Sequence, residues 1–262
     1  MRRAISASSA LLIREVVRFL RERNRVFGAL VQPLLFWILF GAGLKASFRP
    51  PGSEGGGGSY AAYLFPGTVV LVLLFTAIFS TISLIEDRRE GFLQGVLAAP
   101  IPRSSLVLGK VLGGTALALG QGLAVLLCAP LAGVSISIGA VAAAVPLLFV
   151  VAFALTALSF CIAWKMDSTQ GFHAVMTVLL MPLWLLSGAF FPPEGAPGWL
   201  VLLMRADPLT YGLAAFRRIL ALGTERSFAA LPGLGISLGV TALFAVAAFA
   251  TAVRLARAPG AG

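Results

Sequence analysis

The sequence predicts an all-α integral membrane protein with six transmembrane helices, an N-terminal interfacial helix, a short cytoplasmic helix and short outer re-entrant helices. Three observations support this prediction. Hydrophobic residues make up 59% of the 262 residues, well above the roughly 45–50% of soluble domains. Charged residues make up only 11%. Several apolar runs reach the length of about 20 residues that a helix needs to cross a hydrocarbon core.

The first element is a basic helix over residues 5–25. Apolar residues such as Ile5 and Phe19 share one helical face, and four arginines follow another: Arg14, Arg18, Arg21 and Arg25. This pattern is typical of a helix that lies in the membrane interface. A basic flank without such a helix is the alternative. The basic and apolar parts are both too long for a signal peptide, so we expect the segment to be retained.

Six spans follow within a single membrane domain over residues 1–262. We expect them at residues 26–44, 60–85, 107–132, 138–164, 170–191 and 231–253. The loop between the first two spans, residues 47–60, contains Pro-Pro and four consecutive glycines, which exclude regular structure. It is not a phosphate-binding loop, because no Lys-Ser or Lys-Thr follows these glycines.

The distribution of Lys and Arg predicts the orientation. Most of the 20 Lys and Arg residues fall at the N-terminus, in the loops after the second and fourth spans and at the C-terminus. Positive residues favour the cytoplasmic side, so both termini should face the cytoplasm of a multi-pass protein in the cell membrane. The net charge of +10 therefore indicates orientation and anionic-lipid contact, and we expect no nucleic-acid binding.

Two connecting segments are unusual. Residues 86–100, EDRREGFLQGVLAAP, begin with five charges and continue as a helix with an apolar face, Phe92, Leu93, Val96 and Leu97, that stops at Pro100. A helix of this kind can bind in a groove of a partner protein. The alternative is a segment that only connects two spans. Residues 192–222 contain two apolar pieces, each too short to span, that Asp207 and Pro208 interrupt. They predict outer re-entrant helices.

Few residues offer catalytic chemistry. Ser237 lies in a G-x-S-x-G pattern, but this pattern falls inside an apolar span, where Gly235 and Gly239 favour helix packing. Gly91 with Gly95, and Gly109 with Gly113, repeat the same spacing. The lone His173 and the two cysteines, Cys128 and Cys161, are expected to be structural.

The sequence also lacks the features of an ion-coupled transporter and of a channel. Ion-coupled transporters need a carboxylate within the membrane, and no Asp or Glu falls in the middle of a predicted span. The spans also lack the polar stripe that would line a channel. The sequence therefore predicts a membrane transport body without an energy source of its own.

The order of several motifs resembles the type-2 permeases of ATP-binding-cassette exporters, most closely the drug and lipid exporter branch with its daunorubicin-type permeases. The resemblance covers nearly the whole chain and rests on these segments: Tyr63 to Gly67, Glu90 to Leu93, Leu97 to Arg103, Leu108 to Lys110, Leu186 to Pro192 and Asp207 to Tyr211. Carbohydrate exporters are the nearest other branch.

The resemblance implies a permease that moves a hydrophobic or amphipathic cargo, drug-like or lipid-like, out of the cytoplasm. It implies that two permease copies pair as a homodimer and that two separate ATPase subunits hold ATP and Mg²⁺, so this chain needs no cofactor and is no enzyme. Residues 86–100 would be the coupling helix that contacts the ATPase, through Arg88, Arg89, Glu90, Phe92, Leu93, Val96, Leu97 and Pro100. In the outer re-entrant segment, the candidate residues are Phe191, Pro192, Asp207, Pro208 and Tyr211.

Two alternatives stay open at this stage. One is a polysaccharide or glycolipid exporter permease of the same family. The other comes from a different class, a membrane-embedded serine hydrolase that would use Ser237 and His173.

Overall fold

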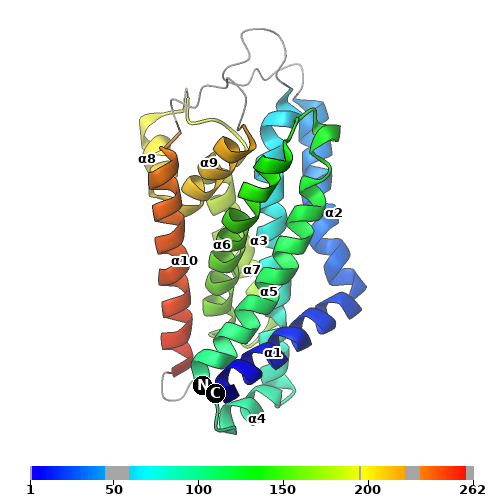
Figure 1. Ribbon diagram of the computed structural model, residues 1–262, viewed down its shortest axis with the longest axis vertical. Coiled ribbons are helices and arrows are strands. Elements are labelled where there is room, and N and C mark those ends of the chain that lie inside the picture. The colour runs from blue at the N-terminus through cyan, green and yellow to red at the C-terminus, as the bar shows by residue number, and fades with distance from the viewer. Residues whose placement is uncertain (1, 45–58, 195, 222–230, 258–262) are drawn as a thin grey trace.

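The computed structural model describes residues 2–44, 59–194, 196–221 and 231–257, and regular structure in these ranges is helical (Figure 1). Six helices are long and apolar enough to cross a membrane. They are α2 (Arg23–Gly43), α3 (Tyr60–Arg89), α5 (Arg103–Leu126), α6 (Ile138–Ala163), α7 (Thr169–Trp184, continued by a π-turn at Leu185–Ala189) and α10 (Leu234–Arg257). The shorter helices are α1 (Arg2–Arg21), α4 (Phe92–Ala98), α8 (Gly198–Ala206) and α9 (Pro208–Leu220). The predicted fold class is confirmed.

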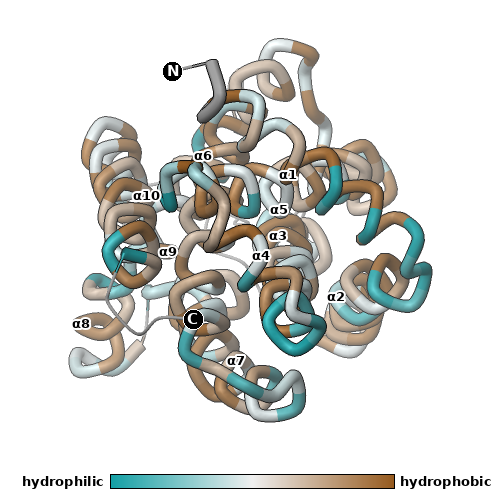
Figure 2. The backbone as a smooth tube through the Cα atoms, turned by 90° about the horizontal axis from the view of Figure 1, so that it is seen from below, coloured by the Kyte–Doolittle hydropathy of each residue, from teal (hydrophilic) through white to brown (hydrophobic). Residues whose placement is uncertain are grey.

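Helix α3 forms the centre of the bundle. Its residues Val69 to Leu74 are completely buried, although the sequence shows no amphipathic pattern there. Figure 2 shows α3 and α5 in the middle, with α2, α6, α7 and α10 around them. The outer helices expose apolar side chains such as Phe27 on α2 and Leu243 on α10. A helix that is apolar all round suits a membrane, where lipid covers its outer face.

The helix bounds differ from the predicted spans at a few ends for local reasons. The α-helical part of α5 ends at Leu126, and a 3₁₀ turn over Ala129–Ala132 follows it, because Pro130 has no N–H for a continuing helix. Helix α7 becomes a π-turn before Gly188, which has a φ of 80°. Helix α10 begins later than predicted, after Pro232 and Gly233, and runs on to Arg257.

The bundle has two distinct ends. Helices α1 and α4 lie at one end, together with the end of α10, and α8 and α9 lie at the other (Figure 1). The guanidinium of Arg103 at the start of α5 donates to the carbonyl of Ala256 at 2.7 Å, which confirms that α10 ends near α4. We call these the α4 end and the α9 end. Most of the predicted loop 47–60 and the last residue of the predicted segment 192–222 lie outside the described residues.

Candidate functional site

Three helices meet at the α4 end, where α1 lies across α5 beside the last turn of α3. Close approach is possible because Gly109 and Gly113 of α5 face α1. A Cβ at Gly109 would lie 2.7 Å from the carbonyl oxygen of Ser8, and one at Gly113 would lie 2.8 Å from the Cβ of Glu15. The Ser8 hydroxyl also donates to the carbonyl of Ser105 at 3.0 Å. Small residues thus let the two backbones pack directly.

A buried group of charges joins the three helices at this crossing. Lys110 of α5 donates to a carboxylate oxygen of Glu15 on α1 at 2.7 Å and to one of Asp87 on α3 at 2.5 Å. All three residues are at most 5% exposed. Ser83 of α3 donates to Glu15 and lies 3.3 Å from the Lys110 ammonium. Because an unpaired buried charge is strongly unfavourable, these mutual contacts stabilise the crossing of the three helices.

Two arginines of α1, Arg14 and Arg18, and one of α2, Arg25, complete this charge cluster. Arg14 makes a bidentate pair with Asp87, at 2.7 and 3.0 Å, and this hydrogen bonding raises the pKa of the Arg14 guanidinium. Arg18 donates to Asp87 at 2.6 Å and to Glu86 at 2.8 Å, and Arg25 pairs with Glu86. Bidentate charged pairs of this kind are among the stronger hydrogen bonds.

This geometry corrects the predicted face of four arginines. Arg14, Arg18 and Arg25 point to the end of α3, and only Arg21 of the four is exposed. The helix α1 also ends at Arg21, before the predicted residue 25, and α2 begins at Arg23. Arginine periodicity alone could not show this arrangement, because the acidic partners lie about 70 residues away in the sequence.

The charged start of residues 86–100 belongs to α3, so the predicted single helix is two pieces. Helix α3 continues to Arg89, and the chain turns at Gly91, which has a φ of 78°, before α4 begins. Arg88 donates to the carbonyls of Trp164 and Met166, and Arg89 to the carbonyl of Asp167 at 2.9 Å. Thus Glu86, Asp87 and Arg88 bind other parts of the same chain.

The apolar face of α4 also points inward. Leu93 is 1% exposed and belongs to the chain's own core, so it cannot fill a groove of a partner in this conformation. Phe92 lies under the Arg14 guanidinium, 3.8 Å from its ring centre. Val96 and Leu97 are half-buried against the core. The exposed residues of this region are Arg89, Glu90, Gly91, Gln94, Gly95, Ala98 and Pro100.

At the α9 end, α8 and α9 are two short helices that meet at Asp207. The Asp207 carboxylate accepts a hydrogen bond from the Leu209 N–H at 2.8 Å and caps α9, and Pro208 occupies the first turn. Burial raises the pKa of Asp207 to about 7, against the opposing effect of that hydrogen bond. Tyr211 donates to the carbonyl of Arg205 at 2.9 Å. Phe191 and Pro192 are half-buried in the preceding turn.

Arg217 of α9 occupies a specific position at this end of the bundle. Its guanidinium donates to the carbonyl of Gly188 at 2.9 Å and lies 4.2 Å from the ring centre of Tyr63. The Tyr63 hydroxyl donates to the same carbonyl at 2.9 Å. Arg217 therefore compensates the carbonyl end of α7, where the helix dipole is negative. The helical break at Gly188 leaves no trace in residue periodicity.

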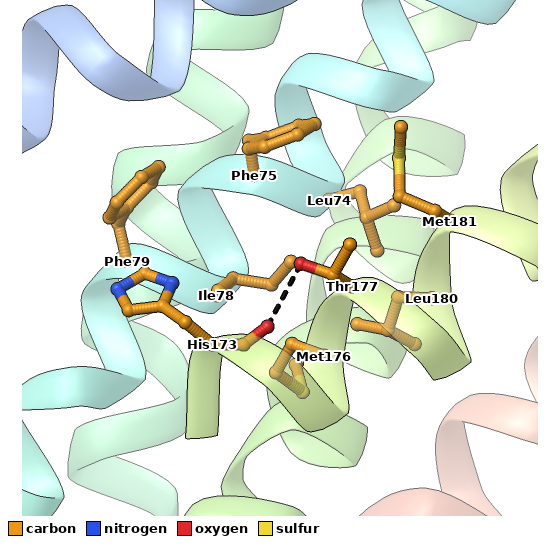
Figure 3. Close-up of a pocket in the computed structure, with 9 residues that line it drawn as sticks. All are labelled: Leu74, Phe75, Ile78, Phe79, His173, Met176, Thr177, Leu180 and Met181. Atoms are coloured by element: carbon orange, nitrogen blue, oxygen red, sulfur yellow. Dashed lines mark hydrogen bonds between the residues drawn. The ribbon is translucent and has the colours of Figure 1, made fainter. Parts of the chain in front are cut away.

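A small cavity lies between α3 and α7 (Figure 3). Apolar side chains line most of it, among them Phe75, Phe79 and Met176, and His173 closes one side. The His173 ring lies 5.5 Å from that of Phe79. The volume of about 30 Å³ admits a water molecule or two, whereas drug-sized ligands need roughly 300–1,000 Å³. The cavity alone therefore holds no large cargo in this conformation.

The structure gives no support to the serine hydrolase alternative. Ser237 is completely buried near the start of α10, and its hydroxyl lies 3.3 Å from the carbonyl of Pro232. His173 lies near the start of α7, which is at the opposite end of the bundle (Figure 1). A Cβ at Gly235 or Gly239 would have no neighbour within 4 Å among the described residues, so only the Gly109 and Gly113 pair shows the packing that the spacing predicts.

Comparison with known proteins identifies the family. The family model of the ABC-2 type transporter matches residues 7–221. The chain is 29% identical over 210 residues to a protein of Cyanophora paradoxa described as a transport permease, ycf38, covering 79% of this chain and 71% of that protein.

Two bacterial relatives match over more of the chain. The daunorubicin resistance ABC transporter permease protein DrrB1 of Streptomyces coeruleorubidus is 25% identical over 247 residues, 92% of this chain and 84% of that protein. Nodulation protein J of Sinorhizobium fredii is 28% identical over 236 residues, 88% of this chain and 84% of that protein. With its six apolar helices and a family match that covers most of its length, the chain belongs to the ABC-2 type transporter family of membrane permeases.

Proposed function

We propose that the chain is the membrane permease of an ATP-binding-cassette exporter and moves a hydrophobic or amphipathic cargo out of the cytoplasm or the inner leaflet. The observation that carries the proposal is the family match over residues 7–221. The sequence contains no G-x-x-x-x-G-K-[ST] motif. ATP would therefore be hydrolysed by separate ATPase subunits.

The α4 end is the side at which these subunits would bind. Basic residues such as Arg21, Arg89, Lys165 and Arg257 gather there, and the positive-inside rule assigns such an end to the cytoplasm. Both chain termini would then lie in the cytoplasm of a cell-membrane protein. The exposed surface of α4, Gln94, Gly95 and Ala98, with neighbouring Glu90 and Pro100, would contact the ATPase. We name these five residues the α4 outer surface.

A second copy of the chain and a second ATPase would complete the exporter. The cavity between α3 and α7 has a volume of only about 30 Å³, too small for a drug-like or lipid-like molecule. A path for such a cargo would thus form between two chains or on a conformational change. The daunorubicin permease among the relatives makes a drug-like cargo the first choice for a test.

The test is co-reconstitution of the permease with an ABC ATPase that co-purifies with it from cells, in vesicles that expose the α4 end outward. Daunorubicin and a fluorescent phospholipid serve as probes of the two cargo classes. We expect ATP-dependent transport of one of them, and neither transport nor ATP hydrolysis by the permease alone. ATP hydrolysis by the isolated permease, or the failure of any ATPase to associate with it, would contradict the proposal.

A further inference from the structure

Lys110 is buried deep inside the charge cluster and has no surface for a partner. Its side chain is 4% exposed, and its ammonium reaches Glu15 at 2.7 Å and Asp87 at 2.5 Å on two other helices. Ser83 is the third neighbour of the ammonium, at 3.3 Å. One side chain on α5 thus contacts both α1 and α3.

Asp87 of α3 is the counterpart of Lys110, because it pairs with Arg14 of α1 and with Lys110 of α5. Arg14 and Arg18 connect α1 to the last turns of α3, and Arg25 connects α2 to them. Gly109 and Gly113 bring α5 against α1. Lys110 alone among these residues makes ionic contacts from α5 to both of the other helices. Without its charge, Glu15 and Asp87 would remain as two buried carboxylates with no ionic partner on α5.

The position of the cluster in the chain gives this contact a mechanical consequence. Asp87 lies in the last turn of α3, and α4 begins five residues later, after the turn at Gly91. Lys110 lies two turns into α5, which begins soon after α4 ends. A force applied to α4 therefore acts on α3 and α5 at almost the same point. The ion pairs of the cluster pass the same force to α1.

We propose that Lys110 is a positioning residue that holds α1, α3 and α5 together as one rigid body, so that a displacement of α4 moves all three helices at once. The proposal rests on the proposed function, since it assigns the displacement to the ATPase. A residue that only stabilised the fold would be replaceable by any arrangement that balances the buried charge. A positioning residue must keep its contacts to both helices.

The variants separate these two roles. K110M removes the charge and both contacts, whereas K110R keeps a cation that can reach two carboxylates. The double variant E15Q/K110M removes one negative and one positive charge, so it keeps the charge balance but still lacks the ionic contact between α5 and α1. K165M changes an exposed lysine at the same end of the bundle and is the matched control.

The measurement is the distance between spin labels on α1 and on the far end of α5, in a chain whose Cys128 and Cys161 are replaced by alanine. Leu20 and Leu127 accept the labels because both are exposed. In the permease alone, we expect a narrow distance distribution in the wild type, K110R and K165M, and a broad one in K110M and E15Q/K110M. An unchanged distribution in K110M, or a restored narrow one in E15Q/K110M, would overturn the proposal.

The second step adds the ATPase and ATP. We expect the wild-type distance to stay the same on ATP addition, because the helices move as one body, and the K110M distance to shift although the ATPase still co-purifies. A K110M distance that stays fixed refutes the transmission role. If the wild-type permease retains no ATPase, the proposed function is contradicted, and so is the role of Lys110 in transmission. The spin-label distances in the permease alone still decide whether Lys110 holds the helices together.

Discussion

At the residue scale, the main features of the molecule are buried charges that the sequence places among apolar residues. Glu15 lies between Leu11 and Phe19 on one helical face, and all three are buried. Lys110 lies in an apolar span. The sequence predicts that such charges need opposite partners, but it does not say which residues these are. The partners of Glu15 and Asp87 come from helices distant in the chain, so only the packing of α1 on α5 identifies them.

Asp207 gives a prediction on pH. Its folded-state pKa of about 7 lies above its ordinary value of 3.8, because burial disfavours the charged form. Folding therefore takes up a proton at this group, and its stabilising contribution is complete below about pH 4 and is lost as the pH rises through about 7. We expect thermal unfolding of the purified permease to show higher stability at about pH 5.5 than at about pH 8.5.

The variant D207N should reduce this difference, because Asn stays neutral and its carbonyl still accepts from the Leu209 N–H. Asp167, whose side chain is 90% exposed, provides the control: D167N should leave the pH dependence as in the wild type. A pH dependence that is identical in D207N and the wild type would show that Asp207 does not titrate in this range.

At the scale of elements, the sequence predicts the six long apolar helices well, because a helix of about 20 apolar residues matches the thickness of the hydrocarbon core. It does not predict which side of each connecting helix packs on the bundle. The block of charges and the apolar face that follows it in residues 86–100 predict a helix that binds a partner. In the structure Asp87 lies in α3 and pairs with Arg18, and Leu93 is buried in the core. The turn at Gly91 requires a positive φ. Glycine allows this φ, but a glycine in the sequence does not by itself predict a turn.

The packing of α4 gives a second prediction. Because Leu93 is 1% exposed, L93A should lower the free energy of unfolding by about 2–5 kcal/mol, as large-to-small core substitutions do. Gln94, its exposed neighbour, is the control, and Q94A should stay within about 0.5 kcal/mol of the wild type. Chemical or thermal unfolding in detergent measures both. If L93A is as stable as Q94A, the α4 helix does not pack on the core as described.

At the scale of the whole molecule, the two ends of the bundle differ in the kind of polar contact that holds them. Ion pairs join α1, α3 and α5 at the α4 end. Hydrogen bonds to the carbonyl of Gly188 join α3, α7 and α9 at the other end. The bundle between them is mostly apolar in the described residues, with a buried hydrogen bond between Thr76 and Gln121. A movement imposed at the α4 end would reach the α9 end through the long helices.

The central claim is that the ATPase binds at the α4 outer surface, and site-specific photo-crosslinking tests it most directly. A photoreactive amino acid replaces Ala98 on α4, or Leu202 on α8, which is exposed at the opposite end of the bundle. In cells that also make the ATPase, we expect a crosslinked permease–ATPase product from position 98 and none from position 202. A product from position 202, or none from position 98 while the complex still co-purifies, would contradict the account.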